Sequence, residues 1–273
     1  MASHPGRLTA APPPVRPTAR PTARPTVQIT RLVRRFGART VLDGVDLEIQ
    51  AGEFVVLLGR SGSGKSTLLR AIAELDDRVV GSGELLMPEN RSVVFQDTRL
   101  LPWARVLDNV ILGLDAPGAE ERGRAALAEV GLAGRERAWP VELSGGEQQR
   151  VALARSLVRE PALILADEPF GALDALTRMR MHDLVRELCA RHRPAVLLVT
   201  HDVDEAIALG DRVLVLVDGR IAVDQHIDLP GHRPHRDPAV LAYRERLLGA
   251  LGVEHAIALN HPARPIDLER TAP

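Results

Sequence analysis

The order of apolar and polar positions divides the chain into segments of different kinds. From Val27, the alternation in VQITRLVRRFG and TVLDGVDLEIQAGE predicts short antiparallel strands that end in a turn at Ala51 and Gly52. Five apolar runs, EFVVLLG, SVVF, ALILAD, AVLLVT and RVLVLV, predict buried strands. Because helical spacing such as KSTLLRAIAEL follows a run of this kind, the pattern favours an α/β fold with a parallel sheet.

Two later stretches break this alternation. Between about Trp103 and Glu160 the spacing is helical, which predicts an all-helical insertion over about 103–160. After about Gln225, HIDLPGHRPHRDP predicts a loop and AVLAYRERLLGAL an amphipathic helix, and we expect the last residues to be loose. We therefore expect one main domain over residues 27–225, followed by a C-terminal extension over residues 226–273.

Residues 1–26 have a different composition. They contain the repeat RPTARPTARPT, several arginines and no acidic residue. Frequent proline removes backbone donors and few apolar groups offset the entropy of ordering, so a disordered tail is expected. Contact of this basic tail with anionic lipid or RNA is an alternative. The first residues, MASHPGRLTAAPPP, lack the apolar segment of a secretory signal, and export is not expected.

Composition narrows the class of protein. The 273 residues are 45% hydrophobic, enough for a core, but the longest apolar runs are about five residues, against the ~20 of a membrane-spanning helix. A formal net charge of -1 gives no reason to expect nucleic-acid binding. The single cysteine, Cys189, excludes an internal disulfide and is interpreted as a small apolar helix residue. We expect no metal site at His226, His232 and His235, which lie in a proline-containing loop without a cysteine or carboxylate framework.

A glycine-rich loop between a buried strand and a helix carries the first chemical motif. The sequence GRSGSGKS matches GxxxxGK[ST], in which backbone N–H groups and the start of a helix bind phosphate. The lysine neutralises the β- and γ-phosphates, and the following serine hydroxyl ligates Mg²⁺. An ordinary glycine-rich turn is the alternative. The predicted phosphate-binding residues are Gly59, Arg60, Ser61, Gly62, Ser63, Gly64, Lys65, Ser66 and Thr67.

Two acidic residues end the strand run LILADE. Parallel sheets open their ligand crevice at the carboxyl ends of strands, which is where Asp167 and Glu168 stand. Asp167 fits a Mg²⁺ ligand, and Glu168 fits a general base that polarises the attacking water. A solvated turn explains such a pair when it stands alone, but the phosphate loop makes the catalytic interpretation the stronger one.

The sequence LSGGE precedes a second helical run, QQRVALARSLV. Ser144 and Glu147 satisfy the S-x-x-E capping box, which by itself starts a helix. Gly145 and Gly146 cost about 1 kcal/mol each in a helix relative to alanine, so stability alone does not account for them. A helix start with bare glycine N–H groups and a serine hydroxyl is a second phosphate site, beyond the one that the chain already has.

These motifs, in this order, resemble those of the ABC ATPases over residues 27–225. The resemblance implies a P-loop NTPase with a RecA-like core, an antiparallel β subdomain and an all-helical subdomain. Gln96 in VFQD is similar to the Q-loop glutamine, which serves catalysis and the metal, Asp174 to the D-loop aspartate, and His201 in VTHD to the switch histidine. Phe36 stands where the family places an aromatic ring on adenine. Gln96, His201 or Phe36 alone would more often be structural or incidental.

The resemblance also implies a mechanism and partners. In the family, two copies face head to tail, and each ATP with its Mg²⁺ lies between the Walker motifs of one copy and the signature loop of the other, here Ser144, Gly145 and Gly146. Closure aligns Glu168 with the attacking water. The implied partners are a second copy, transmembrane permease subunits and, indirectly, a solute-binding protein. The implied location is peripheral, at the cytoplasmic face of the membrane.

The segment DTRLLPWARVLDNVILGL, residues 97–114, bears on the cargo. With GALDALTR it resembles the ATPases of importers for nitrate, taurine and sulfonates, and TRLLPW, LLVTHDVDEA and the late DLP most resemble those of aliphatic sulfonate importers. In the family this segment contacts the permease, although Leu101, Pro102 and Trp103 are also suited to the core of the helical subdomain. The chain after the last strand is too short for the extra barrel domain of sugar importers.

Two other function classes stay open at this level. A non-transport ABC ATPase is one, but translation-type relatives carry two cassettes, and the 78 residues between Lys65 and Ser144 leave no room for the long coiled coil of chromosome-associated relatives. A phosphotransfer kinase on the same core is the other. Such a kinase has no need for LSGGE or for the histidine at position 201.

Overall fold

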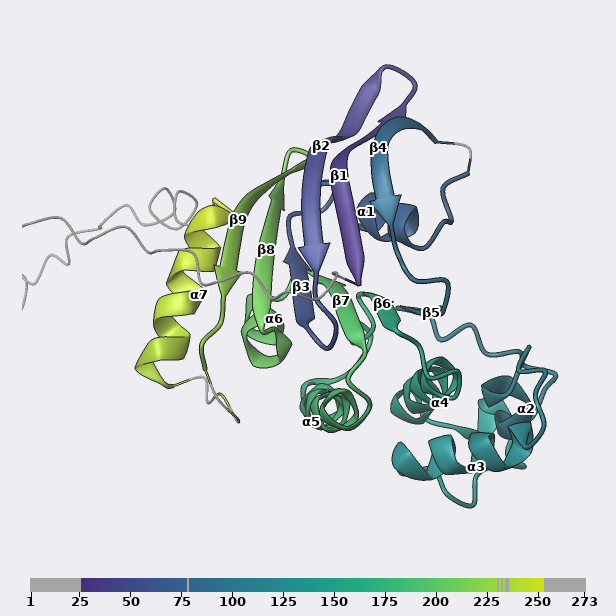
Figure 1. The fold of residues 1–273 in the computed structure, drawn as a ribbon. Coiled ribbons are helices and arrows are strands. Elements are labelled where there is room, and N and C mark those ends of the chain that lie inside the picture. Colours follow the sequence, from purple (N-terminus) through teal and green to yellow (C-terminus); the bar gives the residue numbers. More distant parts are fainter. Residues whose placement is uncertain (1–25, 78, 230, 232, 234–235, 253–273) are drawn as a thin grey trace, which may run out of the picture.

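The computed structural model describes residues 26–77, 79–229, 231, 233 and 236–252 (Figure 1). The predicted tail at the N-terminus, apart from Thr26, and the predicted loose end after residue 252 lie outside the described residues, as do His232 and His235. Within the described part of the chain, no helix is both long and apolar enough to span a membrane.

A three-stranded antiparallel sheet forms from the N-terminal third, in the order β2-β1-β4. Its strands are β1 (Val27–Phe36), β2 (Arg39–Ile49) and β4 (Val80–Leu86). The alternating segments form β1 and β2, as predicted. The strand β4 was not predicted. Its sequence, VGSGELL, contains two glycines and is exposed at nearly every position, so it carries no alternation of buried and exposed residues.

The second sheet has six strands in the order β5-β6-β7-β3-β8-β9. They are β3 (Phe54–Leu58), β5 (Arg91–Phe95), β6 (Leu163–Asp167), β7 (Ala195–Thr200), β8 (Arg212–Val217) and β9 (Arg220–His226). The five apolar runs form its parallel strands, as predicted, and β9 pairs antiparallel with β8 at the edge. Edge strands need no continuous apolar run, which is why β9 was not predicted.

The helices pack on both faces of this central sheet. They are α1 (Lys65–Ile72), α2 (Val106–Val110), α3 (Ala119–Glu129), the 3-10 turn η1 (Pro140–Glu142), α4 (Gly145–Leu157), α5 (Ala175–His192), α6 (Val203–Leu209) and α7 (Pro238–Ala250). Alternate residues of one strand serve the two faces: Val55 and Leu57 join α1 and the antiparallel sheet, whereas Val56 and Leu58 join the remaining helices. Figure 1 shows α2, α3 and α4 gathered together at one end of the molecule.

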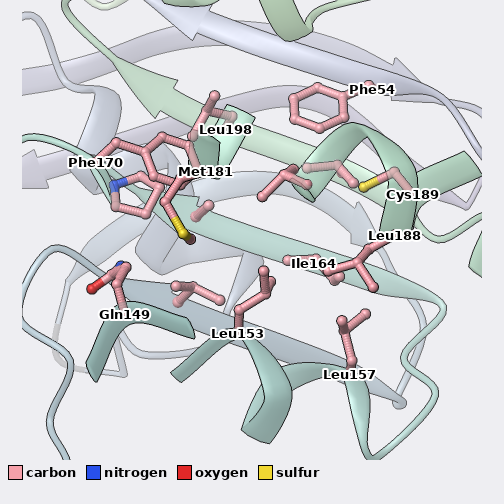
Figure 2. A pocket seen from close by; sticks show the side chains of 15 residues that line it. Phe54, Gln149, Leu153, Leu157, Ile164, Phe170, Met181, Leu188, Cys189 and Leu198 are labelled. Atoms are coloured by element: carbon pink, nitrogen blue, oxygen red, sulfur yellow. The ribbon is translucent and has the colours of Figure 1, made fainter. Parts of the chain in front are cut away.

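A small apolar cavity lies between α4, α5 and the central sheet. Leu153 and Leu157 of α4 and Met181 and Leu188 of α5 point into it (Figure 2). Cys189 also lines this cavity, and burial raises the pKa of its thiol to about 12. The thiol is therefore protonated and unreactive at neutral pH, in keeping with its interpretation as a small apolar helix residue.

Candidate active site

The register of the parallel strands brings the predicted motifs to one edge of the central sheet. Phe95 of β5 pairs with Asp167 of β6, and Asp167 pairs with Val199 of β7. Leu58 of β3 pairs with Thr200. The loops that follow these strands therefore begin side by side, although they are far apart in the sequence. They carry Gln96, Glu168, His201 and the glycine-rich loop, which is the arrangement expected for a ligand crevice in a parallel sheet.

The glycine-rich loop requires glycine at two positions for different reasons. Gly64, which caps α1, has a φ of 107°, a backbone conformation that residues with a side chain rarely adopt. A Cβ on Gly59 would lie 2.7 Å from the carbonyl oxygen of Leu216, so only glycine fits against β8. No side chain caps the first turn of α1, so its backbone N–H groups stay open to an anion.

Lys65 is the only lysine in the chain and lies in this loop. Its side chain is 6% exposed, and Nζ donates hydrogen bonds to the carbonyl oxygens of Gly59 at 2.7 Å and Arg60 at 3.1 Å. Burial lowers the pKa of the ammonium group, while the nearby carboxylates of Glu168 and Asp167 act in the opposite direction. The cation is thus held close to two acidic groups inside the loop.

Ser66 and Asp167 contact each other across 101 residues of sequence. The Ser66 hydroxyl donates a hydrogen bond to Asp167 Oδ1 over 3.2 Å. Burial raises the pKa of Asp167, the hydrogen bond from Ser66 lowers it, and Glu168 raises it further. A hydroxyl and a half-buried carboxylate side by side form the hard oxygen donor set that Mg²⁺ prefers.

Glu168 and His201 lie in contact with each other. Glu168 Oε2 and His201 Nδ1 lie 3.2 Å apart, which is hydrogen-bonding distance. Glu168 has a φ of 45°, which is uncommon for a residue with a side chain, and its N–H donates to the carbonyl oxygen of Val199 at 2.9 Å. A strained residue pinned by a neighbouring strand is often found at a functional site, where the surroundings stabilise its conformation.

One cleft collects most of the predicted phosphate-binding and catalytic residues. Its lining consists of Arg39, Val41, Ser61, Gly62, Gly64, Lys65, Ser66, Thr67, Glu168 and His201. Phe36 does not line the cleft but ends β1 nearby with half of its surface exposed. Arg39 and Val41, across the tight turn from Phe36, were missed because nothing in their sequence marks them before the hairpin is placed.

Gln96 lies at the edge of this region. It directly follows β5 and is exposed, and its Nε2 atom lies 3.2 Å from the position that a Cβ on Gly171 would take. The glutamine therefore contacts the loop that follows Glu168. Its predicted part in holding the metal stays a prediction.

The signature loop starts α4 with a complete capping box. The Ser144 hydroxyl oxygen accepts a hydrogen bond from the Glu147 N–H at 3.3 Å, and Glu147 Oε2 accepts from the Ser144 N–H at 2.9 Å. Glu147 also contacts Arg135 at 3.2 Å. The backbone and side-chain hydrogen bonds from Ser144, and then Arg135, lower the pKa of Glu147, so its carboxylate is ionised at neutral pH.

The two glycines of this loop differ in their surroundings. A Cβ on Gly146 would lie 2.7 Å from the methyl group of Thr177, so the packing of α4 against α5 already requires this glycine. Nothing lies within 4 Å of the corresponding position on Gly145. The expectation that stability does not account for the glycines is therefore corrected for Gly146 and holds for Gly145.

Asp174 and the signature loop share a second pocket. Asp174 caps α5 by accepting from the N–H groups of Leu176 at 3.1 Å and Thr177 at 3.0 Å. The pocket is lined by Ser144, Gly145, Gly146 and Asp174 among others, and none of the phosphate-loop residues takes part in it. The two helix starts that are predicted to bind anions therefore line different cavities.

Comparison with known proteins identifies the family. The sequence profile described as ABC transporter matches residues 42–171. Over 228 residues, the chain is 75% identical to the aliphatic sulfonates import ATP-binding protein SsuB 2 of Nocardia farcinica, which covers 83% of this chain and 95% of the relative. The chain belongs to the ABC transporter ATP-binding proteins. Its counterpart in Mesorhizobium japonicum is 67% identical over 93% of this chain and 97% of the relative.

Solved structures agree with this assignment. The ATP-binding cassette MJ0796, dimeric and bound to ADP and phosphate, is 31% identical and matches 75% of this chain and all of its own, with a TM-score of 0.65. The cassette cbiO1 of Clostridium perfringens, 23% identical with a TM-score of 0.70 over 88% of this chain and 97% of its own, supports the fold alone. The predicted P-loop NTPase fold with its antiparallel β and helical additions is thereby confirmed, as is a nucleotide-binding function.

Proposed function

We propose that this ABC ATP-binding protein hydrolyses ATP to drive an importer of aliphatic sulfonates. The separation of its two predicted anion-binding helix starts carries the proposal, because the two starts line different clefts and an ATP site built from both needs a second copy. The names of the relatives at 75% and 67% identity support the cargo. The partners that follow are a second copy of the chain and permease subunits at the cytoplasmic face of the membrane, with a solute-binding protein acting through the permease.

The first half of the site holds the nucleotide phosphates. The open N–H groups at the start of α1 donate to phosphate oxygens, and Lys65 neutralises their charge from the same side. Lys65 leaves the carbonyl oxygens of Gly59 and Arg60 when it turns toward the phosphates. Phe36, at the end of β1, contacts the adenine ring in this proposal, next to Arg39 and Val41.

Magnesium fits Ser66, which lines the same cleft, and Asp167, which contacts Ser66. Ser66 and Asp167 supply adjacent hydroxyl and carboxylate oxygens, and Gln96 is proposed as a further ligand. When bound, the ion neutralises charge that develops on the phosphate oxygens. A bound cation would also offset the burial that raises the pKa of the Asp167 carboxyl group.

Glu168 and His201 act on the attacking water. We assign Glu168 the role of general base, which typically contributes about 10²–10⁴ in rate. His201, 3.2 Å from Glu168, orients that carboxylate and contacts the γ-phosphate. The strained backbone of Glu168 and its hydrogen bond to β7 fix the direction of the side chain before the substrate arrives.

The second half of the site comes from a second copy. In this arrangement, Ser144, Gly145 and Gly146 of one copy bind the γ-phosphate held by the phosphate loop of the other, and Asp174 lies beside the junction. The dimeric cassettes among the solved relatives support such a pairing. Hydrolysis then separates the two copies, and the permease uses that motion.

Uptake in a host that lacks its own sulfonate importer ATPase tests the cargo. The gene, expressed together with its neighbouring permease and binding-protein genes, should restore growth on an alkanesulfonate as sulfur source, and the Glu168→Gln variant should not. Restoration on taurine or nitrate alone would replace the cargo, and ATP hydrolysis without any restoration would favour a non-transport ABC ATPase. ATP-dependent phosphorylation of a small molecule would favour the kinase.

A further inference from the structure

Side chains from two helices hold the backbone of residues 98–105, the segment that follows Gln96. Arg155 of α4 donates from Nη2 to the carbonyl oxygen of Thr98 at 2.6 Å and from Nη1 to that of Arg99 at 3.0 Å. These are charge-assisted bonds to the backbone, which are stronger than neutral ones. The beginning of the segment is therefore attached to the helix that starts with the signature loop.

Asn109 of α2 holds the middle of the same segment. Its side chain is completely buried; Oδ1 accepts from the Leu101 N–H at 2.7 Å, and Nδ2 donates to the carbonyl oxygens of Leu101 at 3.1 Å and Ala104 at 3.0 Å. A fully satisfied buried amide of this kind fixes one backbone shape. Trp103 lies within this fixed segment with 74% of its surface exposed. The structure thus presents a large apolar side chain on a preformed platform.

Arg105, at the end of residues 98–105, contacts the stretch of chain that leads into the signature loop. Its Nη1 atom donates to the carbonyl oxygen of Arg137, and its guanidinium group lies 4.4 Å from the centre of the Trp139 ring. Next to it, the Val106 N–H donates to the carbonyl oxygen of Ala138 at 3.0 Å. The start of α2 is therefore capped by the segment that precedes η1.

Hydrogen bonds also hold the backbone between Trp139 and Ser144 in place. The Trp139 N–H donates to Glu142 at 2.6 Å, and Gln148 Nε2 donates to the carbonyl oxygens of Pro140 and Leu143, both at 3.1 Å. Residues 98–105 are thus attached on both sides of the signature: through Trp139, five residues before Ser144, and through Arg155, eleven residues after it.

We propose that Arg105 and Trp139 are positioning residues. They join residues 98–105, which carry Trp103, to the signature loop, so that the two move together. A permease that pushes on Trp103 then displaces Ser144 and Gly145, and ATP binding at the signature loop moves Trp103. This inference rests on the proposed function, and it names the contact through which the two partner surfaces of the chain communicate. Arg105 lies outside both clefts, so it acts on hydrolysis only through Ser144 and Gly145.

The isolated chain gives the first test. Trp103→Phe leaves Trp139 as the single tryptophan, because the chain has only two. Adding Arg105→Ala should increase iodide quenching of Trp139 and speed amide hydrogen exchange at residues 106–107 and 144–148 by about five- to tenfold. Arg124→Ala is the matched control, since Arg124 is an exposed arginine of α3 whose salt bridge within the described residues is with Glu120. Faster exchange at residues 106–107 without any change at 144–148 would overturn the proposal.

The assembled importer gives the second test. With its permease and binding protein in lipid vesicles, the Arg105→Ala subunit should lose about tenfold in solute-stimulated ATP hydrolysis, a larger loss than in the basal rate of the isolated subunit. Arg105→Lys, which keeps the charge but not the planar group, should restore part of the stimulation. Full stimulation of Arg105→Ala, or an equal fall in basal rate, would contradict the inference. Absence of stimulation in the parent would instead reject the proposed function.

Discussion

Two helices of this protein begin at motifs that are predicted to bind anions, and the hydrogen bonding of their first backbone N–H groups differs. α1 starts after Gly64 without any side-chain cap, next to the buried ammonium group of Lys65. α4 starts after Ser144 with a complete capping box, in which the anionic group is the chain's own Glu147. The first start is open to a polyanion. At the second, the N–H groups of Ser144 and Glu147 are already hydrogen-bonded within the chain, which leaves those of Gly145 and Gly146 for an anion.

In the proposed function, one start captures the nucleotide and the other pairs the subunits. On this proposal, ATP stays on α1 because Lys65, the only lysine in the chain, adds a cation to that cleft. The start of α4 offers the Ser144 hydroxyl, already bonded to Glu147 Oε2 at 2.9 Å, and therefore competes weakly for free nucleotide. An ATP that a second copy already holds rigidly loses little further entropy on binding, so it can bind to the weaker start at α4.

Removal of the cation at α1 should have the largest effect. Lys65→Ala should lower ATP hydrolysis by about 10²–10³ because a preorganised charge on the phosphates is lost. Lys65→Arg is the matched variant: it keeps the charge, but its planar fork does not fit the loop, and most activity should still be absent. Steady-state phosphate release measures both, with thermal melting to show that each variant folds. Undiminished hydrolysis by Lys65→Ala would contradict the assignment of this cleft.

Removal of the carboxylate beside α1 should separate activity from stability. Burial raises the pKa of Asp167 in the folded, nucleotide-free chain above its unfolded value. The protonated carboxyl group therefore favours the fold at low pH, and this contribution to stability is lost as pH rises through the raised pKa. At neutral pH, Asp167→Asn should therefore melt higher than the parent, and the difference should shrink on acidification. Hydrolysis should fall by at least about 10–100-fold, since even outer-shell changes at metal sites cost that much. A lower melting temperature at pH 7 would show that the carboxylate is stabilised in the fold.

The two glycines at α4 should respond in opposite directions, with smaller effects. Gly146→Ala places a methyl group against Thr177 and should destabilise the fold by about 1–3 kcal/mol. Gly145→Ala meets no atom within 4 Å and should stabilise the helix by about 0.4–1 kcal/mol, while weakening ATP-driven pairing. Chemical denaturation measures the first property, and light scattering with ATP measures the second. Equal stability losses for the two variants would remove the distinction between them.

Part of this account was predictable from the sequence, and the remainder needed the fold. Buried strands such as β6 are predicted by their apolar runs. The residue types in GRSGSGKS and LSGGE predict phosphate binding. Edge strands β4 and β9 leave no such run. The contact between Glu168 and His201 depends on the register of β6 and β7. The clash at Gly146 depends on how closely α4 approaches α5, which no local pattern encodes.

The assembly of one ATP site from two copies is the central claim, and the mass of a hydrolysis-deficient chain in ATP tests it most directly. Light scattering of Glu168→Gln should give the 29.7 kDa monomer without nucleotide and about twice that mass with ATP and Mg²⁺. The further substitution Gly145→Glu places a carboxylate at the start of α4, where the helix accommodates a negative charge. The same carboxylate repels a phosphate held by a partner, so this double variant should stay monomeric. A double variant that dimerises as fully as Glu168→Gln, or a Glu168→Gln chain that stays monomeric with ATP, would contradict the account.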